Sequence, residues 1–310
     1  MRDRYQGAIV GLAVGDALGF PVEFIGSAEI RHRYGSRGIS GFVASHSHRP
    51  GTYTDDTQMS LAVAAALVRA GRGSLDEVMT AVAVELLKWS TSPENDRAPG
   101  STTMSACRRL AAGRPWRESG IPESKGNGST IRTAPIGLYR HDDLSTLIEI
   151  ARHSSLITHG HPCAVAGAVA NAVAVASALK GIPPDCLLPT IIQATETISG
   201  EFVEKLRQVP EVLALPPDGA FDVLGDAWVA EEAMAAALYC FLRSPRDFQT
   251  TVLTGANASG DSDSVACLAG GISGAYNGVS VIPEEWRQQI ENSAGLVAAA
   301  EALWEAAGKP

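Results

Sequence analysis

Charged residues, aromatic residues and cysteines are all scarce in this sequence, and each shortage narrows what the protein can be. Of its 310 residues, 19% are charged, 6% are aromatic and five are cysteines. The cysteines are scattered and never stand in Cys-x-x-Cys spacing, which argues against a zinc knuckle and against a disulfide framework. We therefore expect free thiols that behave as small apolar groups in a reducing compartment.

Basic residues are fewer than acidic ones. The chain has 25 Lys and Arg against 34 Asp and Glu, for a formal net charge of −9. This balance argues against a general binder of nucleic-acid backbones. Hydrophobic residues make up 45% of the chain, which is typical of a globular protein and provides a sizeable core.

A confident membrane span is also missing. The longest stretch of small apolar residues, CAVAGAVANAVAVASALK at 163–180, has Asn171 at its middle and little side-chain bulk. The N-terminus turns apolar after its first charges, but the run is short and Asp16 interrupts it, so a signal peptide is not indicated. We predict a cytoplasmic protein with no membrane partner.

Strand signals are scarce, whereas apolar residues recur at helical spacing. Several of the predicted helical runs lie in the second half of the chain, at 143–153, 161–180, 226–243, 264–277 and 283–308. Segments rich in Gly, Pro and Ser separate the runs, and no repeat or low-complexity linker divides the chain. We predict an all-α fold, a single compact domain of many short helices over residues 1–310. Abundant Ala and 31 glycines suggest helices whose backbones pack closely.

Two acidic stretches open predicted helices, GTYTDDTQMS at 51–60 and GDSDS at 260–264. Each combines one hydroxyl with two carboxylates: Thr54, Asp55 and Asp56 in the first, and Asp261, Asp263 and Ser264 in the second. Asp, Ser and Thr are preferred helix N-caps, and acid in the first turn suits the helix dipole, so capping can explain either stretch alone. A cap uses one side-chain oxygen, however, and each stretch offers a surplus.

Binding of divalent cations would explain that surplus. If the two stretches meet in the fold, their carboxylates crowd together and raise one another's pKa, which bound cations would relieve. All candidate ligands are oxygens, so Mg²⁺, Mn²⁺ or Ca²⁺ is favoured over zinc. Asp56 and Asp263 could each bridge two ions about 3.5–4 Å apart, as two-metal sites do.

A glycine-punctuated loop, ESKGNGSTIR at 123–132, is a candidate phosphate site. Backbone N–H groups of such loops can bind phosphate oxygens, and Ser129 and Thr130 would add hydroxyls. An ordinary turn explains the same pattern.

Two further polar side chains stand near predicted helix starts or loops. His159, in LITHGHP just ahead of a helix that could begin at Pro162, is by itself more typical of a cap or packed polar group than of a catalytic base. Arg97 in RAPG is interpreted as an exposed loop arginine.

Six segments, in this order, carry a family resemblance: GLAVGDALGFPVEF (11–24), GTYTDDTQMS (51–60), RAPGSTTMSA (97–106), GNGSTIRTAPIGL (126–138), LITHGHP (156–162) and GDSDSVACLAGGISGAYNG (260–278). Together they resemble the ADP-ribosylglycohydrolase family, whose bacterial members include dinitrogenase reductase-activating glycohydrolase. The resemblance implies an all-α domain with a two-metal centre, usually of magnesium or manganese, that cleaves the bond between ADP-ribose and its acceptor.

The resemblance also implies roles for individual residues. The ligands of two divalent cations, Mg²⁺ or Mn²⁺, would be Thr54, Asp55, Asp56, Asp261, Asp263 and Ser264. Glu23 would be the catalytic acid or base, although a surface or salt-bridged glutamate is the alternative for this position. The substrate-binding residues would be Gly126, Asn127, Gly128, Ser129, Thr130 and, near the adenosine part, His159.

We therefore predict a metal-dependent hydrolase that cleaves the glycosidic bond between ADP-ribose and a modified acceptor. ADP-ribosyl-arginine is slightly favoured, while serine, a nucleic-acid base, O-acetyl-ADP-ribose and poly(ADP-ribose) stay open. The partner would be an ADP-ribosylated protein or other acceptor, and a nucleic acid only if it carries the modification. The alternative is a catalytically silent ADP-ribose-binding, structural or immunity protein on the same fold.

Overall fold

The computed structural model describes residues 1–45 and 47–308, and these residues form helices joined by loops, with isolated β-bridges but no strand. The predicted all-α class is confirmed. In chain order the elements are α1 (Arg2–Gly19), η1 (Phe20–Val22), α2 (Ser27–Tyr34), α3 (Asp55–Ala70), α4 (Leu75–Ser90), α5 (Ser101–Ala111), α6 (Trp116–Ser119), α7 (Gly128–Ile131), α8 (Ala134–Tyr139), α9 (Leu144–Leu156), α10 (Pro162–Leu179), α11 (Pro184–Thr195), α12 (Gly200–Arg207), α13 (Val209–Val212), α14 (Pro217–Leu224), α15 (Ala230–Arg243), α16 (Phe248–Ala256), α17 (Ser262–Asn277), η2 (Val279–Val281), α18 (Glu284–Gln289) and α19 (Ser293–Ala306).

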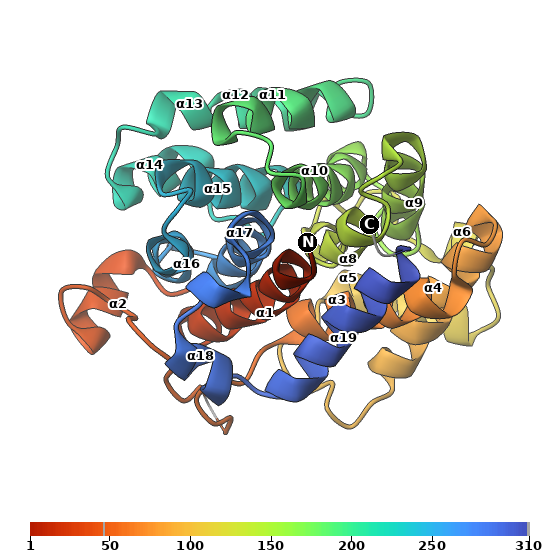
Figure 1. The fold of residues 1–310 in the computed structure, drawn as a ribbon, viewed down its shortest axis with the longest axis horizontal. Helices are drawn as coiled ribbons and strands as arrows, with labels where there is room; N and C mark the ends of the chain where they lie inside the picture. Colours follow the sequence, from red (N-terminus) through yellow and green to blue (C-terminus); the bar gives the residue numbers. More distant parts are fainter. Residues whose placement is uncertain (46, 309–310) are drawn as a thin grey trace.

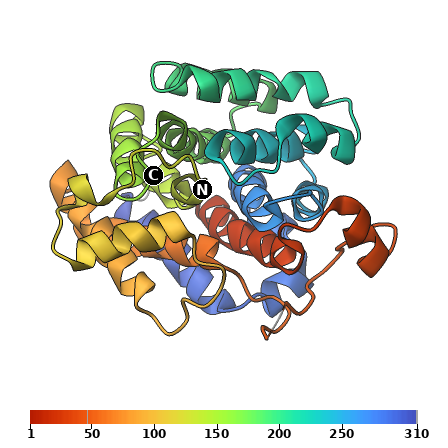
Figure 2. The same cartoon turned by 180° about the vertical axis from the view of Figure 1, so that it is seen from behind.

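Helices α1 and α17 lie side by side at the centre of the molecule (Figure 1). Helices α11, α12 and α13 form an outer layer over α10 and α15, as the view from behind also shows (Figure 2). Helices α3, α4 and α19 lie on the other side of the central pair. Segments from both ends of the chain therefore meet in the middle of the fold.

A row of glycines allows α1 and α17 to approach so closely. The glycines recur at every fourth position of α1, on one helical face: Gly7, Gly11, Gly15 and Gly19. A Cβ atom on Gly15 would lie 2.0 Å from the carbonyl oxygen of Ala266, and one on Gly19 would lie 2.4 Å from the Cα atom of Asp263. The backbone-close packing predicted from composition is present here, and it brings the end of α1 against the start of α17.

The predicted helical run 283–308 forms two helices, α18 and α19, so the prediction of one continuous run was wrong. Asn292 has a left-handed backbone conformation, with φ of 51°, which interrupts a right-handed helix. The N–H of Glu291 donates to the carbonyl of Gly51 at 2.9 Å instead of to a helical partner. A tertiary contact therefore separates α18 from α19.

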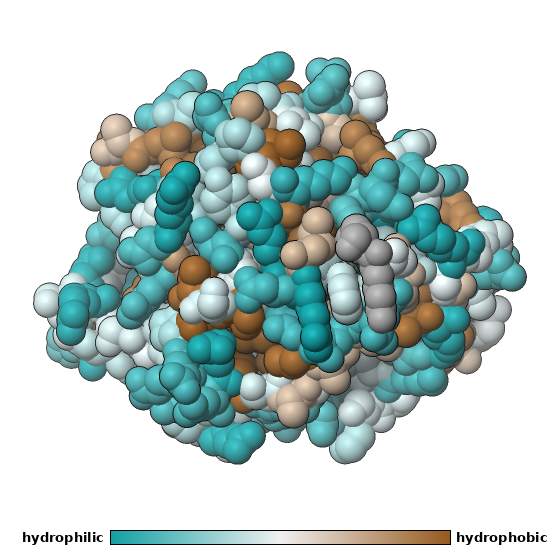
Figure 3. All heavy atoms as spheres, viewed as in Figure 1, coloured by the Kyte–Doolittle hydropathy of each residue, from teal (hydrophilic) through white to brown (hydrophobic). Residues whose placement is uncertain are grey.

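Helix α10 is apolar and almost entirely buried. It is long and apolar enough to cross a membrane, as α1 and α2 would be if they formed one broken span, yet 94% of the α10 window is buried inside the protein. The face shown in Figure 3 is mostly hydrophilic, with apolar residues in small groups. The Asn171 side chain donates to the Thr130 carbonyl at 2.9 Å, which ties α10 to α7. All five cysteines are free, as expected.

Candidate metal centre and substrate cleft

The two acidic stretches begin neighbouring helices and meet at one end of a cleft of about 350 Å³. The hydroxyl of Ser264 donates to a carboxylate oxygen of Asp56 at 3.1 Å, which joins positions 208 residues apart. Thr54 also caps α3, because its hydroxyl oxygen accepts the N–H of Asp56 at 3.2 Å. Capping and clustering therefore coexist in the first stretch.

Five carboxylates line this end of the cleft, those of Glu23, Asp55, Asp56, Asp261 and Asp263. Burial, and next the charge of a neighbouring carboxylate, raises the pKa of Asp55, Asp56 and Asp263 well above the usual range. Burial is also the main reason that the pKa of Glu23 rises to about 7. Ionising so many neighbouring buried acids is costly unless positive charge compensates them.

The donor set fits hard divalent cations. Carboxylate oxygens of Glu23, Asp261 and Asp263 lie within 4.8 Å of one another. Of these, Asp261 and Asp263 are predicted ligands and Glu23 is the predicted catalytic residue. Three more predicted ligands line the cleft and also offer only oxygen: Asp55, Asp56 and Ser264. Mg²⁺ and Mn²⁺ prefer such ligands, whereas zinc prefers nitrogen and sulfur.

Asp16 belongs to the support of this centre, although it was not among the residues predicted from the sequence. Its buried carboxylate accepts the N–H of Thr54 at 2.9 Å, the N–H of Thr57 at 3.0 Å and the hydroxyl of Thr57 at 2.5 Å. Burial raises its pKa to about 6, against the lowering effect of these hydrogen bonds. Asp16 thereby holds the start of α3 against α1. Its signal was visible, since an acid inside an apolar helix needs partners.

The glycine loop forms another wall of the cleft. Gly126, Asn127 and Gly128 line it, whereas Ser129 and Thr130 are fully buried and do not. The oxygen of Ser129 accepts the hydroxyl of Ser155 at 2.9 Å, behind the wall. The two hydroxyls expected to contact a substrate thus lie inside the protein, where that of Ser129 supports the loop, because the chain turns inward into α7 directly after Gly128.

Asn127 connects the glycine loop to the acidic end of the cleft. Its side-chain amide donates to a carboxylate oxygen of Asp261 and to the carbonyl of Ala227, each at 2.9 Å. Its own N–H donates to the carbonyl of Trp228 at 3.2 Å. One residue therefore orients a candidate metal ligand and fixes the segment opposite.

That opposite segment differs from the predicted helical run 226–243. Helix α15 begins only at Ala230, because the residues before it pair with other loops. The carbonyl of Asp226 accepts the N–H of Asp261 at 2.8 Å, and the N–H of Ala230 donates to the carbonyl of Lys125 at 2.9 Å. These tertiary hydrogen bonds replace helical ones.

Two exposed aromatic side chains stand at the rim of the cleft, and the sequence analysis missed both. Phe24 is 60% exposed and Trp228 is 58% exposed, and both line the cleft. An unusual backbone conformation accompanies each ring: φ is 56° at Phe24 itself and 66° at Ala227, the residue before Trp228. Large apolar rings held in water at a cleft are suited to stacking on flat groups of a ligand.

His159 contributes to the same wall as the glycine loop. Its Nδ1 lies 2.8 Å from the hydroxyl oxygen of Thr158, and a Cβ atom on Gly126 would lie 3.2 Å from its Nε2. Burial, followed by the charge of Arg132, lowers the pKa of His159 to about 3. The imidazole is therefore neutral at physiological pH.

Arg97 is buried, so the expectation of an exposed loop arginine was wrong. It pairs with both carboxylate oxygens of Glu291, at 2.5 and 3.0 Å, and donates to the carbonyl of Tyr53 at 3.2 Å. Its own carbonyl accepts the N–H of Asp55 at 3.3 Å. Arg97 thus braces the segment that leads into α3, and a partner distant in sequence explains its burial.

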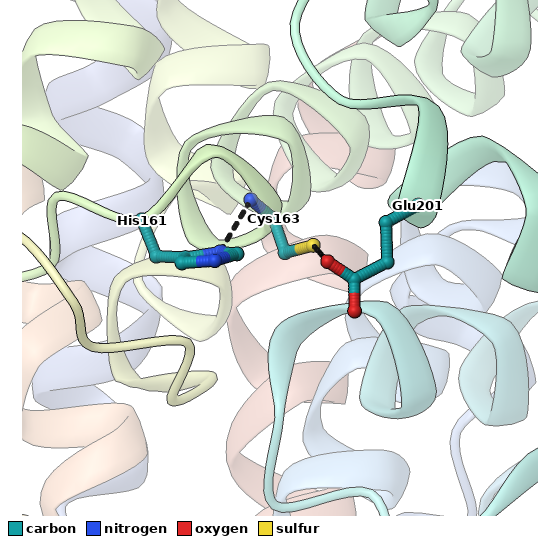
Figure 4. Close-up of side chains that lie close together, drawn as sticks. All are labelled: His161, Cys163 and Glu201. Atoms are coloured by element: carbon teal, nitrogen blue, oxygen red, sulfur yellow. Dashed lines mark hydrogen bonds between the residues drawn. The ribbon is translucent and has the colours of Figure 1, made fainter.

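A second group of metal-ligand types lies next to the glycine loop and consists of His161, Cys163 and Glu201 (Figure 4). The Nδ1 of His161 caps α10 by accepting the N–H of Cys163 at 3.1 Å, and the thiol lies 3.3 Å from a Glu201 carboxylate oxygen. Burial raises the pKa of this thiol to about 12, and Lys125 pairs with Glu201 at 2.6 Å. Because its groups already satisfy one another, this cluster is suited to anchoring Lys125 rather than a metal ion.

Comparisons of sequence and structure find known proteins that are similar to this chain over most of its length. The model of the ADP-ribosylglycohydrolase family matches residues 1–310. The chain is 28% identical to ADP-ribosylarginine hydrolase Tri1 of Serratia proteamaculans, over 97% of this chain and 79% of that protein. It is 28% identical to ADP-ribosyl-[dinitrogen reductase] glycohydrolase of Rhodospirillum rubrum, over 94% and 91%. A solved structure titled ADP-ribosylglycohydrolase-related protein complex has a TM-score of 0.79 and 30% identity, covering 99% of this chain and 98% of that one.

Proposed function

The chain belongs to the ADP-ribosylglycohydrolase family, and we propose that it releases ADP-ribose from modified arginine side chains in a reaction that depends on Mg²⁺ or Mn²⁺. The observation that carries the metal dependence is the group of five carboxylates at one end of the cleft. The arginine acceptor is supported by the name of the Serratia relative, an ADP-ribosylarginine hydrolase. We propose a cytoplasmic location as well, because the free thiols favour a reducing compartment.

Two divalent cations would be held by the acidic end of the cleft. The proposed ligands are Thr54, Asp55, Asp56, Asp261, Asp263 and Ser264. When bound, the cations would supply positive charge and Lewis acidity at the ribose hydroxyls and at a water molecule. Asn127 would keep Asp261 oriented, and Asp16 would keep the start of α3 in place.

Glu23 is the proposed acid. Without bound cations, burial is the main reason that its pKa is raised to about 7, and its carboxyl group lines the acidic end of the cleft, where it can act in proton transfer. In the reaction a water oxygen bonds to the anomeric carbon and the bond from that carbon to the acceptor breaks. Glu23 gives its proton to the departing acceptor atom and afterwards takes up the proton that the water loses.

The opposite walls would hold the remainder of the substrate. Gly126 and Gly128 can offer their backbone N–H groups to the diphosphate, whereas the N–H of Asn127 is bonded to the Trp228 carbonyl. Trp228 and Phe24 would stack on a flat group of the substrate. Binding energy from these remote parts would position the reacting carbon at the acidic end.

The proposal is tested with defined ADP-ribosylated peptides and nucleic acids, by chromatography of free ADP-ribose. We expect release from an arginine-modified peptide with added Mg²⁺ or Mn²⁺, loss of release with EDTA, and recovery when either metal is returned. Asp263→Ala should abolish release, whereas Asp222→Asn, an exposed aspartate on α14, should not change it.

Other products would contradict the proposal in distinct ways. Release unaffected by EDTA would reject the metal dependence, and release of phosphate would indicate a phosphohydrolase. Preferred release from serine, a nucleic-acid base, O-acetyl-ADP-ribose or poly(ADP-ribose) would replace arginine as the acceptor. Tight ADP-ribose binding without any release would support a catalytically silent binding protein.

A further inference from the structure

Arg132 is a buried cation without a carboxylate partner. Its side chain is 0% exposed, and the groups that accept its hydrogen bonds are all uncharged. They are the carbonyl of Ser154 at 2.6 Å, the hydroxyl of Thr158 at 2.9 Å and the carbonyl of Gly128 at 3.5 Å. Among the described residues its Nε has no hydrogen-bond partner. Burying a guanidinium in this way is costly, because three neutral acceptors replace only part of the lost hydration and no negative charge balances it.

The position of Arg132 gives that charge a use. It contacts Gly128 and Thr158 from behind the wall that the glycine loop and His159 form. Gly128 is part of this wall, and Thr158 directly precedes His159 in the chain. The described residues that line the cleft include no lysine or arginine. Lys125, next to the loop, is already paired with Glu201 and Glu231.

A buried charge acts farther than an exposed one, because the protein interior screens it weakly. A diphosphate is an anion that must enter a cleft lined by carboxylates. At the glycine wall, the uncompensated positive charge of Arg132 lowers the electrostatic cost of that entry. A purely apolar residue in its place would not.

Arg132 also acts on His159 through Thr158. The guanidinium donates to the Thr158 oxygen, so the hydroxyl must direct its own proton elsewhere, and the Nδ1 of His159 lies 2.8 Å away. If Nδ1 accepts this proton, the neutral ring carries its hydrogen on Nε2. The Nε2 lies beside Gly126, at the surface of the cleft.

We propose that Arg132 is a positioning residue for the diphosphate: its unpaired charge favours an anion at the glycine wall, and through Thr158 it holds His159 as an Nε2–H donor toward the cleft. This inference rests on the proposed function, because that function supplies the diphosphate. Arg132 was not among the site residues predicted from the sequence.

The test compares ligands with and without phosphates on the Mg²⁺-loaded protein. ADP-ribose affinity is measured by calorimetry, and adenosine binding by ligand-detected NMR. Arg132→Met should weaken ADP-ribose binding about tenfold or more, with adenosine and Mg²⁺ affinities unchanged. Arg132→Lys, which keeps the charge, should restore most of the affinity. Arg140→Met, at a buried arginine directly after α8 and outside the cleft, is the matched control and should have no effect.

Two further measurements keep the test decisive if Arg132→Met fails to fold. Nitrogen NMR of His159 in the wild-type protein should show the hydrogen on Nε2, and a hydrogen on Nδ1 would overturn the relay. Thr158→Val, which leaves the charge in place, should weaken ADP-ribose binding by a few-fold and alter the His159 spectrum. Equal losses for ADP-ribose and adenosine in the Arg132 variants, or no loss in either, would leave Arg132 a structural residue.

The two proposals fail in different ways. A wild-type protein that binds no ADP-ribose would contradict the proposed function itself. If the wild-type protein binds ADP-ribose, but the Arg132 variants lose no more affinity for ADP-ribose than for adenosine, only this inference would be contradicted.

Discussion

At the scale of single residues, the cleft is lined by titratable groups whose pKa values are shifted in opposite directions. Burial, followed by the charges of Asp261 and Asp16, raises the pKa of Glu23 to about 7, while burial keeps His159 neutral on another wall. Their environments thus separate a proton donor from a neutral hydrogen-bonding group.

Replacing Glu23 should affect the chemical step. Glu23→Gln removes the titrating proton but keeps the size of the side chain, so we expect kcat to fall about 10²–10⁴-fold with KM nearly unchanged. Stability should not fall, because the substitution removes a carboxylate that the neighbouring Asp261 and Asp16 repel. Steady-state kinetics and thermal unfolding measure both. The exposed Glu29→Gln serves as control, and an unchanged kcat in the Glu23 variant would exclude it as the acid.

Replacing Trp228 should affect binding instead. Trp228→Ala removes an exposed ring that the neighbouring backbone holds in place, and loss of one stacking contact of about 1 kcal/mol or more should raise KM roughly five- to tenfold. We expect kcat to change less. Trp228→Phe should recover most of the binding, and equal kinetics for all three proteins would show that the ring does not contact the substrate.

At the scale of secondary-structure elements, the close approach of α1 and α17 builds the acidic end. Helix α1 leads into η1 and Glu23, and α17 begins with Asp263 in its first turn. The separation of these helices therefore sets the separation of the carboxylates. A methyl group inserted between the helices would alter both packing and metal binding.

Gly15→Ala tests this coupling. The added Cβ would lie 2.0 Å from a backbone carbonyl oxygen of α17, which cannot move without the helix, so we expect a loss of about 1–3 kcal/mol in unfolding free energy. Denaturant unfolding measures the loss, and calorimetry should show weaker Mg²⁺ binding. Gly219→Ala, in α14 with open space around it, is the matched control and should be neutral or stabilising. Equal effects of the two substitutions would contradict close helix packing as the cause.

At the scale of the whole molecule, the acidic cluster links stability to pH and to cations. A carboxyl whose folded pKa is raised stabilises the fold at low pH, and this stability is lost as pH rises from its unfolded value through its folded value. For Asp16 and Glu23 the folded values are about 6 and about 7. His159 acts in the opposite sense, since its lowered pKa costs stability as pH falls below its unfolded value.

The increase in Tm caused by Mg²⁺ reports on the acidic cluster separately from other titrating groups such as His159. We expect millimolar MgCl₂ to raise Tm more at pH 7.5 than at pH 5, because cations compete with protons for the carboxylates. Differential scanning fluorimetry with EDTA as the reference measures both shifts. Asp263→Asn should reduce the Mg²⁺ effect at pH 7.5, and a shift that is equal at both pH values would contradict a carboxylate site.

The family and the all-α class could be predicted from the sequence, and both are confirmed. The contributions of Trp228 and Arg97 could not, because each depends on a partner or surface far away in the chain. Asp16 had a visible signal, but only the fold identified its partners. Thr130 shows the converse, since a motif placed it at the cleft and the fold buried it. The metal ligands, Glu23 as the acid, and the single-domain span over residues 1–310 remain predictions.

The amino-acid sequence by itself determined that the chain is helical and roughly where most helices lie, because helical periodicity and capping are local along the chain; tertiary hydrogen bonds set the start of α15 and the break between α18 and α19. It also determined the oxygen-only character of the acidic stretches. Only the tertiary structure decided that these stretches share one end of a cleft, that α1 and α17 touch backbone to backbone, and that Arg132 is buried without a counter-ion. Burial and charge pairing depend on distances through space, and those distances exist only once the chain is packed.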